Sequence, residues 1–359
     1  MTDDAPVLVV GSQSIHVERF VRGLSAAGVR TVVATQGEIA FGRLPGLLDA
    51  TTLDLGTRSW SAPSRLRALI RRWAPAVVHV HQASSIAWYA VRAARSLGVP
   101  VVVTLWGSDV LKLHEWNWLH RWKVQHALRS ADAWTADARV LLTAAERVCG
   151  PQVPVRREWI PIGIDPPPAL PEVPRERRLL SCRLHKPLYR IDEILRAFAG
   201  LPETQSDWVL EVAASGGETT ALQHLAQELG LGARVQFTGM LPALELARAY
   251  RRSALFVSVP ESDGTSVSLL EAMEAGCLPV LSDLPANREW VQDKHTGVLV
   301  ADLDGLGAAL LHAMQWWESG SWDLGGRIVN EQGVADQALF ADNIRQFVAL
   351  YESLRSAAR

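Results

Sequence analysis

The chain alternates short runs of Val, Ile and Leu with longer segments of helical period, and this pattern occurs twice along its 359 residues. Such runs are typical of buried strands in parallel sheets, and the longer segments are typical of crossover helices. The pattern stops at PPPALPEVP, residues 166–174, and then resumes. A Pro-rich segment cannot continue a helix and acts as a semi-rigid spacer. The sequence therefore predicts an α/β protein of two successive doubly wound, Rossmann-like domains.

The expected domain limits are 1–165, a linker at 166–176, 177–335, and a C-terminal helix within 336–359 that packs back toward the first domain. The expected strands of the first domain are Val7–Val10, Arg30–Ala34, Ala76–Val80, Val99–Thr104, Ala133–Ala136 and Arg157–Ile160. Those of the second are Arg178–Cys182, Trp208–Ala213, Arg234–Thr238, Leu255–Val259, Leu278–Ser282 and Gly297–Val300. Ligands of such sheets bind beyond the carboxyl ends of the strands, so we expect the site in a cleft between two facing domains.

The composition is that of an ordinary globular protein, with 48% apolar and 21% charged residues and a formal charge of −2. The first 165 residues carry 19 Lys and Arg against 13 Asp and Glu, or +6, and the remainder carries 17 against 25, or −8. The three cysteines are widely spaced, which excludes a disulfide scaffold and favours a reducing compartment. The acidic N-terminus resembles no signal peptide, and no apolar run could span a bilayer. We therefore expect a cytoplasmic protein.

Three other kinds of site are disfavoured by their motifs. The turn after the first strand reads GSQSIH rather than G-x-G-x-x-G, and no G-x-x-x-x-G-K-[ST] loop occurs, which argues against a nicotinamide dehydrogenase or a P-loop enzyme. His79 and His81 share one face of a strand, but no further metal ligands have suitable spacing. Asp302 and Asp304 form a D-x-D pair that we interpret as a solvated turn. No metal site is predicted.

The most informative stretch is SVPESDGTSVSLLEAMEAGCLPVLSD, residues 258–283. A strand ends, an acidic loop follows, and Thr265 or Ser266 caps a helix. The first amides of that helix have no internal acceptor, which makes an anion site. Asp263 and Glu271, eight positions apart, can line one ligand at different heights, and a carboxylate suits the paired hydroxyls of a diol. A helix-start residue and a solvated helix face would explain the same two acids.

This stretch resembles the signature of glycosyltransferase family 4, whose members are retaining nucleotide-sugar enzymes of GT-B fold. The family pattern reads E-G-F-G-x-x-x-x-E-A-M-A-x-G-x-P-V, with two glutamates separated by seven residues. Within DGTSVSLLEAMEAGCLPV, Asp263 takes the position of the first glutamate and Glu271 that of the second. The sequence DGTSVSLLEAM is similar to a variant found among polysaccharide-building members, which implies a subfamily of active enzymes.

The resemblance covers nearly the whole chain. The opening segment VVGSQSIHVERFVRGLSAAGVRTVVAT carries the S-x-H-x-x-R pattern, and AVVHVH, VVTLWGSDVL and WIPIGIDPPP resemble later motifs of the family's first domain. LLSCRLHKPLYRIDEILRAFAGL resembles the start of its nucleotide-binding domain. The order and spacing of these motifs make the combination specific.

The family resemblance implies an acceptor-binding first domain and a second domain that binds a nucleoside diphosphate sugar. The implied catalytic residues are Asp263, Glu271 and Arg183, of which Arg183 would clamp the diphosphate and the developing negative charge of the leaving group. The implied donor-binding residues are Lys186, Arg190, Gly264, Thr265, Ser266 and Val267. The implied acceptor or sugar-binding residues are Ser14, His16, His81, Trp106 and Asp109. No cofactor or divalent metal is implied, because helix amides and Arg183 neutralise the diphosphate.

The chain departs from the family pattern at four places. Asp263 is one methylene shorter than the usual Glu, Thr265 replaces an aromatic residue, and Trp106 replaces the His of H-G-S-D. The Lys of the usual R-K-G is missing, so either Lys186 or Arg190 must supply the second phosphate contact. The family mechanism also leaves two roles open for Asp263: an orienting residue in a same-face displacement, or a covalent nucleophile.

The segment KLHEWNWLHRWKVQHALR, residues 112–129, interleaves tryptophans with basic residues. This composition suits a membrane interface, where indoles sit at the headgroup boundary and cations meet anionic lipid. A helix packed on its own domain would explain most of the same residues. Nucleic acid is disfavoured because Glu115 and uncharged histidines interrupt the patch. Peripheral contact with the inner face of the cell membrane through 112–129 is therefore a hypothesis.

The sequence thus predicts a retaining glycosyltransferase that moves a sugar from a nucleoside diphosphate sugar to a glycan, glycolipid or small-molecule acceptor. Bacterial polysaccharide or lipopolysaccharide assembly is the expected setting. A sugar-nucleotide epimerase of the same architecture and a non-catalytic sugar-nucleotide-binding protein are the alternatives.

Overall fold

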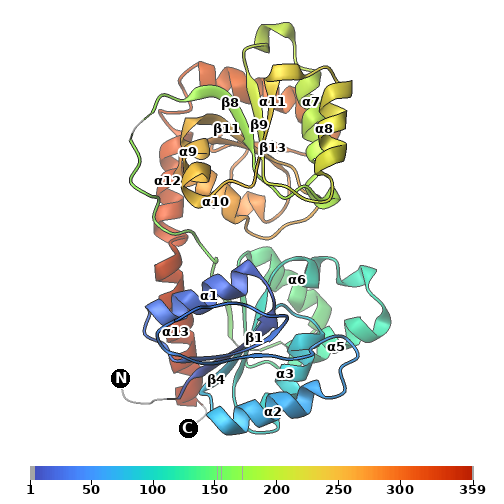
Figure 1. Cartoon of the computed structure of the whole chain (residues 1–359), viewed down its shortest axis with the longest axis vertical. Helices are drawn as coiled ribbons and strands as arrows, with labels where there is room; N and C mark the ends of the chain where they lie inside the picture. The colour runs from blue at the N-terminus through green and yellow to red at the C-terminus, as the bar shows by residue number, and fades with distance from the viewer. Residues whose placement is uncertain (1–4, 152, 155, 172, 358–359) are drawn as a thin grey trace. The chain divides into compact units, whose positions relative to one another are not determined.

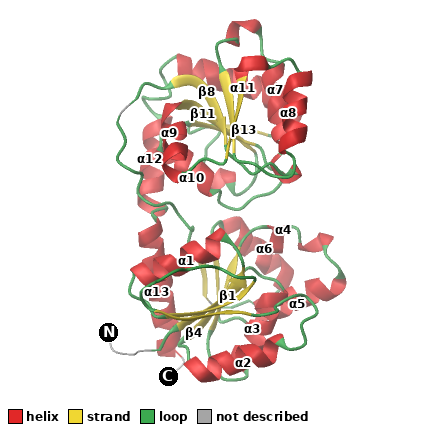
Figure 2. Cartoon of the chain, in the orientation of Figure 1, coloured by secondary structure: helices red, strands yellow, loops and turns green. Residues whose placement is uncertain are grey.

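The computed structural model describes residues 5–357 except 152, 155 and 172. The chain divides into two compact domains. The N-terminal domain comprises residues up to Ile162 together with Phe340 onward, and the C-terminal domain comprises Gly163–Leu339. Each domain has one sheet, coloured yellow in Figure 2, with helices around it. The predicted Pro-rich linker forms no helix or strand between residues 166 and 175, and residue 172 of it lies outside the described residues.

The N-terminal sheet has seven parallel strands in the order β3-β2-β1-β4-β5-β6-β7. The strands are β1 (Val7–Ser12), β2 (Thr31–Gln36), β3 (Leu47–Thr52), β4 (Val77–His81), β5 (Val101–Leu105), β6 (Ala133–Ala136) and β7 (Arg156–Trp159). The helices are α1 (Ile15–Ala26), α2 (Ala62–Trp73), α3 (Ser85–Arg95), α4 (Ser108–Leu111), α5 (Trp118–Ser130), α6 (Arg139–Cys149) and α13 (Phe340–Ala357). The strand order reverses between β1 and β4, which is the topological switch point of this sheet.

Alternate residues of each strand point to opposite faces of the sheet, and one face of the N-terminal sheet packs against α1 and α13. Val7 and Val9 of β1 pack with Phe20 of α1 and with Phe347 of α13. Helix α13 therefore belongs to the N-terminal domain although it lies at the end of the chain, and it runs beside α1 (Figure 1).

The C-terminal sheet has six parallel strands in the order β10-β9-β8-β11-β12-β13. The strands are β8 (Glu176–Ser181), β9 (Val209–Ala213), β10 (Val235–Gly239), β11 (Ser253–Ser258), β12 (Leu278–Ser282) and β13 (Val298–Val300). The helices are α7 (Ile191–Ala199), α8 (Thr219–Glu228), α9 (Ala243–Arg252), α10 (Val267–Glu274), α11 (Leu306–Glu318) and α12 (Gly326–Gln337). Here the strand order reverses between β8 and β11.

The predicted fold class is confirmed, because both sheets are parallel throughout and are covered by helices. Twelve strands were expected, and each lies within a few residues of an observed one. The edge strand β3 was not predicted. The predicted functional assignments of the two domains stay predictions. No helix among the described residues has the length and apolarity needed to cross a membrane.

Candidate functional site

The predicted catalytic residues lie at the switch point of the C-terminal sheet. Arg183 follows β8, and Asp263 follows β11, the strand hydrogen-bonded to β8. The loop after β11 leads into α10, whose fifth residue is Glu271. Because the carboxyl ends of parallel strands meet at one edge of a sheet, residues 80 positions apart in the sequence come into contact there.

Arg183 is the centre of this site. Its guanidinium donates from Nη2 to Oδ2 of Asp263 at 2.7 Å and from Nη1 to Oγ of Ser268 at 3.2 Å, and it also donates to the hydroxyl of Ser266. The ring of Tyr189 lies under the guanidinium, with its centroid 4.3 Å from Cζ. Arg183 thus binds the acidic loop, the start of α10 and the segment after β8 at once.

The ion pair between Arg183 and Asp263 is largely buried, with the two side chains 11% and 22% exposed. Burial raises the pKa of the Asp263 carboxyl, and the charge of Arg183 partly offsets that rise. For Arg183, burial lowers the pKa, but the charges of Asp263 and Tyr189 outweigh it, so the pKa is raised. Arg183 is therefore a permanent cation at this site.

The start of α10 lies directly beside this cation. Ser266 occupies the N-cap position, yet its hydroxyl bonds to Arg183 and Ser268 rather than to a helix amide. Thr265 is buried and accepts a hydrogen bond from Nε1 of Trp290 at 3.1 Å. Of the two predicted helix caps, Thr265 and Ser266, Ser266 occupies the N-cap position. Its hydroxyl accepts a hydrogen bond from Arg183 and does not cap a helix amide. The first amides of α10 have no acceptor within the helix.

Glu271 is held by a second buried group. The hydroxyl of Tyr250, on α9, lies 3.1 Å from Oε2 of Glu271 and 3.1 Å from Sγ of Cys182. Cys182 directly precedes Arg183. Burial raises the pKa of the Cys182 thiol to about 12 and raises that of Tyr250 well above 10, so both groups keep their protons at neutral pH.

The two candidates for a second phosphate cation differ in exposure. Lys186 is exposed, and Arg190 is half-buried in a left-handed conformation at φ 49°, where it begins α7. Neither side chain forms a hydrogen bond or ion pair with another described residue. Both cations are therefore available to contact a second phosphate.

Four predicted residues of the N-terminal domain gather at the other switch point. Ser14 and His16 follow β1, and His81 ends β4, the strand beside β1. The hydroxyl of Ser14 accepts the amide of Val17 at 3.2 Å and so caps α1. The ring of Trp106 lies edge-on to His16 at 4.6 Å and to His81 at 5.7 Å between centroids. The structure therefore brings these residues together.

His81 and Trp106 keep unused hydrogen-bonding atoms in this cluster. Both ring nitrogens of His81 and Nε1 of Trp106 are buried and have no hydrogen-bond partner among the described residues. Burial, together with the smaller effect of the charge of His16, lowers the pKa of His81 to about 3, so this imidazole is neutral at ordinary pH. Such atoms are able to bind hydroxyl groups of a ligand.

Asp109 differs from His81 and Trp106, because its carboxylate already accepts hydrogen bonds from main-chain amides. It accepts the amides of Ala83 at 2.9 Å, Gly107 at 2.9 Å and Trp106 at 3.1 Å. Burial raises its pKa, and these amides partly offset the rise. Asp109 therefore ties the loop after β4 to the loop after β5, and it fixes the backbone of Trp106.

Sequence reasoning missed Ser268, Tyr189, Tyr250 and Cys182. Ser268 lies two positions after Ser266 within DGTSVSLLEAM. Tyr189 lies in the region where the family pattern has the Lys of R-K-G. Tyr250 lies 21 residues before its partner Glu271, on another helix, and no sequence signal links the two. Among the described residues no group of three or more His, Cys, Asp or Glu side chains could hold a metal ion.

Two family models match the chain in the order of its domains. A model described as "Glycosyl transferase 4-like" matches residues 7–138, and one described as "Glycosyl transferases group 1" matches residues 169–319. An α-monoglucosyldiacylglycerol synthase of Streptococcus pneumoniae is 29% identical over 139 residues, which are 39% of this chain and 32% of the synthase. A GDP-mannose-dependent α-mannosyltransferase of Mycobacterium tuberculosis is 28% identical over 70% of this chain and 65% of the relative. The chain thus spans less than two thirds of the length of these relatives.

Solved structures share the fold. HepE of Anabaena in complex with UDP superposes with a TM-score of 0.80 at 14% identity, covering 97% of this chain and all of that one. A sucrose-phosphate synthase of Thermosynechococcus elongatus superposes with a TM-score of 0.78 at 18% identity, covering 98% and 100%. Two Rossmann-like domains of this kind define the GT-B class. The two family models, one on each domain, and the mannosyltransferase relative support a glycosyltransferase of family 4 and of this class.

Proposed function

We propose that the protein is a retaining glycosyltransferase that moves a sugar from a nucleoside diphosphate sugar to a hydroxyl of a glycan, glycolipid or small-molecule acceptor. The C-terminal domain binds the donor, and the N-terminal domain binds the acceptor. The observation that carries this proposal is the contact of Arg183 with Asp263, Ser266 and Ser268 at the switch point of the C-terminal sheet. Bacterial polysaccharide or lipopolysaccharide assembly is the setting, in keeping with the named mannosyltransferases among the relatives.

The donor diphosphate binds where positive charge is concentrated. A guanidinium fork pairs well with phosphate oxygens, and the amides at the start of α10 add a partial positive charge beside it. HepE was solved with UDP, which supports a nucleoside diphosphate as the ligand of this fold. As the bond to the sugar breaks, the same groups stabilise the charge on the leaving phosphate.

Asp263 acts as an orienting residue in this proposal rather than as a covalent nucleophile. Its Oδ2 accepts from Arg183 at 2.7 Å and its Oδ1 accepts from the amide of Gly264 at 3.1 Å. A carboxylate with both oxygens engaged is a weak nucleophile. We therefore favour a same-face displacement, in which a leaving phosphate oxygen takes the proton of the incoming hydroxyl and the anomeric configuration is kept.

No divalent cation takes part in the proposed reaction, because Arg183 and the α10 amides supply the positive charge. Transfer rates measured with excess EDTA and with added Mg²⁺ should agree within about twofold. A rate that depends on Mg²⁺ and is abolished by EDTA would require a metal-bridged diphosphate instead.

Donor identity is tested by thermal shift against UDP, GDP, ADP, TDP and CMP. One nucleoside diphosphate should raise the melting temperature selectively, since a ligand at 100 times its Kd adds about 2.7 kcal/mol.

NMR of the product made from the matching sugar donor then reports the anomeric configuration. Inversion would refute the retaining mechanism, and full transfer by both Asp263→Ala and Glu271→Ala would refute the site. Conversion of the donor without acceptor into an epimeric sugar nucleotide would indicate an epimerase.

We also propose that the acceptor is reached at an anionic lipid surface through residues 112–129. Four large apolar side chains of this segment are exposed: Trp116, Trp118, Leu119 and Trp122. Lys123 is turned inward, where its Nζ donates to the carbonyl of Thr57 at 2.6 Å, so it does not meet lipid. Arg121 and Arg129 are the exposed cations of α5. Indoles and guanidinium groups on one segment suit the headgroup region of a bilayer.

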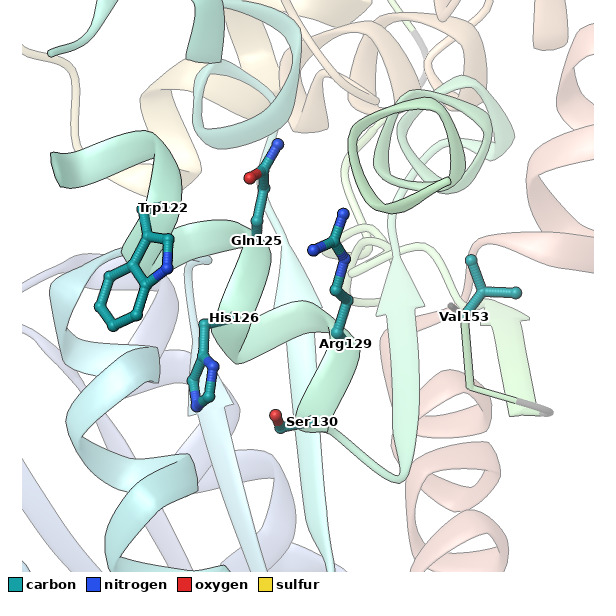
Figure 3. Close-up of a pocket in the computed structure, with 6 residues that line it drawn as sticks. All are labelled: Trp122, Gln125, His126, Arg129, Ser130 and Val153. Atoms are coloured by element: carbon teal, nitrogen blue, oxygen red, sulfur yellow. The ribbon is translucent and has the colours of Figure 1, made fainter. Parts of the chain in front are cut away.

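An open pocket of about 510 Å³ lies along the last turns of α5. It is lined by Trp122, Gln125, His126, Arg129, Ser130 and Val153 (Figure 3). Arg95 of α3 reaches its edge, where Nη1 donates to the carbonyl of Ser130 at 2.9 Å. Burial lowers the pKa of His126, which lines the pocket, and the charges of Arg92 and Arg95 lower it further. Such a pocket suits a phosphate headgroup beside the exposed tryptophans.

Flotation with vesicles containing about 30% phosphatidylglycerol tests this surface. The Trp116→Ser/Trp118→Ser variant should lose most of its vesicle binding. The control is Trp60→Ser, because Trp60 is 97% exposed on the same domain but lies outside the segment. Wild-type protein that stays wholly unbound, or equal loss in the control, would refute the membrane contact and leave the transfer reaction untouched.

A further inference from the structure

Beside the donor site lies a partly buried hydrogen-bond chain, of which the proposed reaction uses Glu271 but neither Cys182 nor Tyr250. It runs from the thiol of Cys182 through the hydroxyl of Tyr250 to the carboxylate of Glu271, with both distances 3.1 Å. The three residues come from the segment after β8, from α9 and from α10. No two of them are close in the sequence, so the fold alone assembles the chain.

The direction of the hydrogen bonds in this chain follows from chemistry. A deprotonated carboxylate can only accept, so the hydroxyl of Tyr250 must donate to Glu271. That hydroxyl has a single proton, so the thiol of Cys182 must donate to the phenolic oxygen. The raised pKa values of both groups keep both protons in place.

Tyr250 is rigidly held. Its side chain is 2% exposed and belongs to the core cluster that contains Phe256, Leu270 and Met273. Its carbonyl accepts the thiol of Cys277 at 3.1 Å. A hydroxyl fixed in this way sets the position of Oε2 of Glu271, and with it the plane of the whole carboxylate.

We propose that Tyr250 is a positioning residue that sets how well the donor site distinguishes a ribose from a 2′-deoxyribose. This inference rests on the proposed function and on the expectation from the sequence that Glu271 accepts hydrogen bonds from a vicinal diol, here that of the nucleotide ribose. Two parallel hydrogen bonds from a diol require the carboxylate in one orientation, and Tyr250 supplies it. Cys182 supports Tyr250 and connects this position to Arg183, the next residue along the chain.

The test compares nucleoside diphosphates with and without the 2′-hydroxyl. Calorimetry gives the Kd of UDP and dUDP, or of GDP and dGDP if the guanine nucleotide is the one bound. The wild type should prefer the ribonucleotide. In Tyr250→Phe, which removes one oxygen atom, the ratio of the two Kd values should fall by about 3- to 10-fold, as expected for the loss of one hydrogen bond. Binding of the deoxynucleotide should hardly change.

Three controls assign each outcome. Tyr351→Phe removes the hydroxyl of another buried tyrosine, in the N-terminal domain, and should leave the ratio unchanged. Cys182→Ala should lower the ratio less than Tyr250→Phe does. Glu271→Ala should abolish the preference for the ribonucleotide.

If Glu271→Ala abolishes this preference while Tyr250→Phe keeps the full ratio with an unchanged melting temperature, the positioning role is refuted. If neither variant alters the ratio, the assignment of Glu271 itself fails, and if no nucleotide binds, the proposed function fails.

Discussion

Arg183 and Asp263 form an ion pair of 2.7 Å between the ends of β8 and β11, the two strands at which the order of the C-terminal sheet reverses. The guanidinium that we assign to the donor diphosphate therefore already has a carboxylate partner. In the proposed function the diphosphate competes with Asp263 for Arg183, and this competition makes the roles of the two residues separable by experiment.

Asp263→Asn should bind the nucleoside diphosphate more tightly while transferring sugar more slowly. The substitution removes the competing charge, so Arg183 is free to pair with phosphate, and the Kd should fall by about 2- to 10-fold. The transfer rate should fall at least about 100-fold, because the orienting charge at the reacting centre is lost. Calorimetry and initial rates give the two quantities. Asp207→Asn is the control, since Asp207 pairs with Arg177 at 2.5 Å elsewhere in the domain and should change neither. Weaker nucleotide binding by Asp263→Asn would contradict the competition.

Arg183→Lys should weaken nucleotide binding by about 10- to 100-fold although it keeps the charge. The guanidinium contacts Ser266, Ser268 and Asp263 together, and a single ammonium group cannot make these three contacts in the same plane. The Kd of the nucleotide and the melting temperature measure the two effects. Arg177→Lys, at an exposed ion pair, provides the control. Unchanged affinity in Arg183→Lys would mean that only the charge matters.

The strands could be predicted because buried parallel strands are short runs of Val, Ile and Leu. Ala133–Ala136 and Leu278–Ser282 match the observed β6 and β12 residue for residue. The strand β3, LLDATT, was missed because it is a half-exposed edge strand without such a run. Helix α12, GRIVNEQGVADQ, was missed because two glycines and a weak apolar stripe hide its period, and its formation depends on packing against α10.

The site could be predicted only in part, for a related reason. Sequence spacing identified Asp263 and the start of α10, but it could not show that Ser266 bonds to Arg183 instead of capping the helix. Asp109 was assigned to a ligand from its motif, whereas its carboxylate accepts main-chain amides. The basic residues of the segment 112–129 were expected to meet lipid, yet one of them, Lys123, is buried. In each case the missing information is a tertiary contact.

The stability of the N-terminal domain should fall as the pH drops below about 6.5, because of His79 and His81. Burial lowers the pKa of both, to about 3 for His81, so the unfolded chain takes up protons that the folded domain does not. The folded pKa lies below the unfolded one, so stability is lost as the pH falls below about 6.5, by about 1.4 kcal/mol per pH unit for His81 down to about pH 3. His79 adds to this loss because its pKa is lowered in the same direction. Urea unfolding followed by circular dichroism at about pH 7 and about pH 5 measures the loss.

The variant His81→Leu should remove the contribution of His81 to the loss of unfolding free energy at acidic pH. Its leucine fills a similar volume and leaves no buried ring nitrogen without a partner. The slope of stability against pH below about 6.5 should therefore be shallower than in the wild type by about one histidine's share. The matched control is His114→Leu, since the His114 side chain is 73% exposed on the same domain. A slope that is as steep in His81→Leu as in the wild type would rule out His81 as its source.

The same substitution, Gly→Ala, should have opposite effects in α1 and α12. A Cβ on Gly23 of α1 would lie 2.7 Å from Cζ of Phe340 and 2.8 Å from Cδ1 of Ile344, both on α13. These side chains lie in the core between the two helices, so Gly23→Ala should destabilise the N-terminal domain by about 1–3 kcal/mol. A Cβ on Gly333 of α12 meets nothing within 4 Å, so Gly333→Ala should stabilise the helix by about 0.5–1 kcal/mol. Urea unfolding of the two variants compares the signs directly. Because the intrinsic gain of helix propensity is the same at both positions, a neutral or stabilising Gly23→Ala would mean that α13 does not pack tightly on α1 in solution.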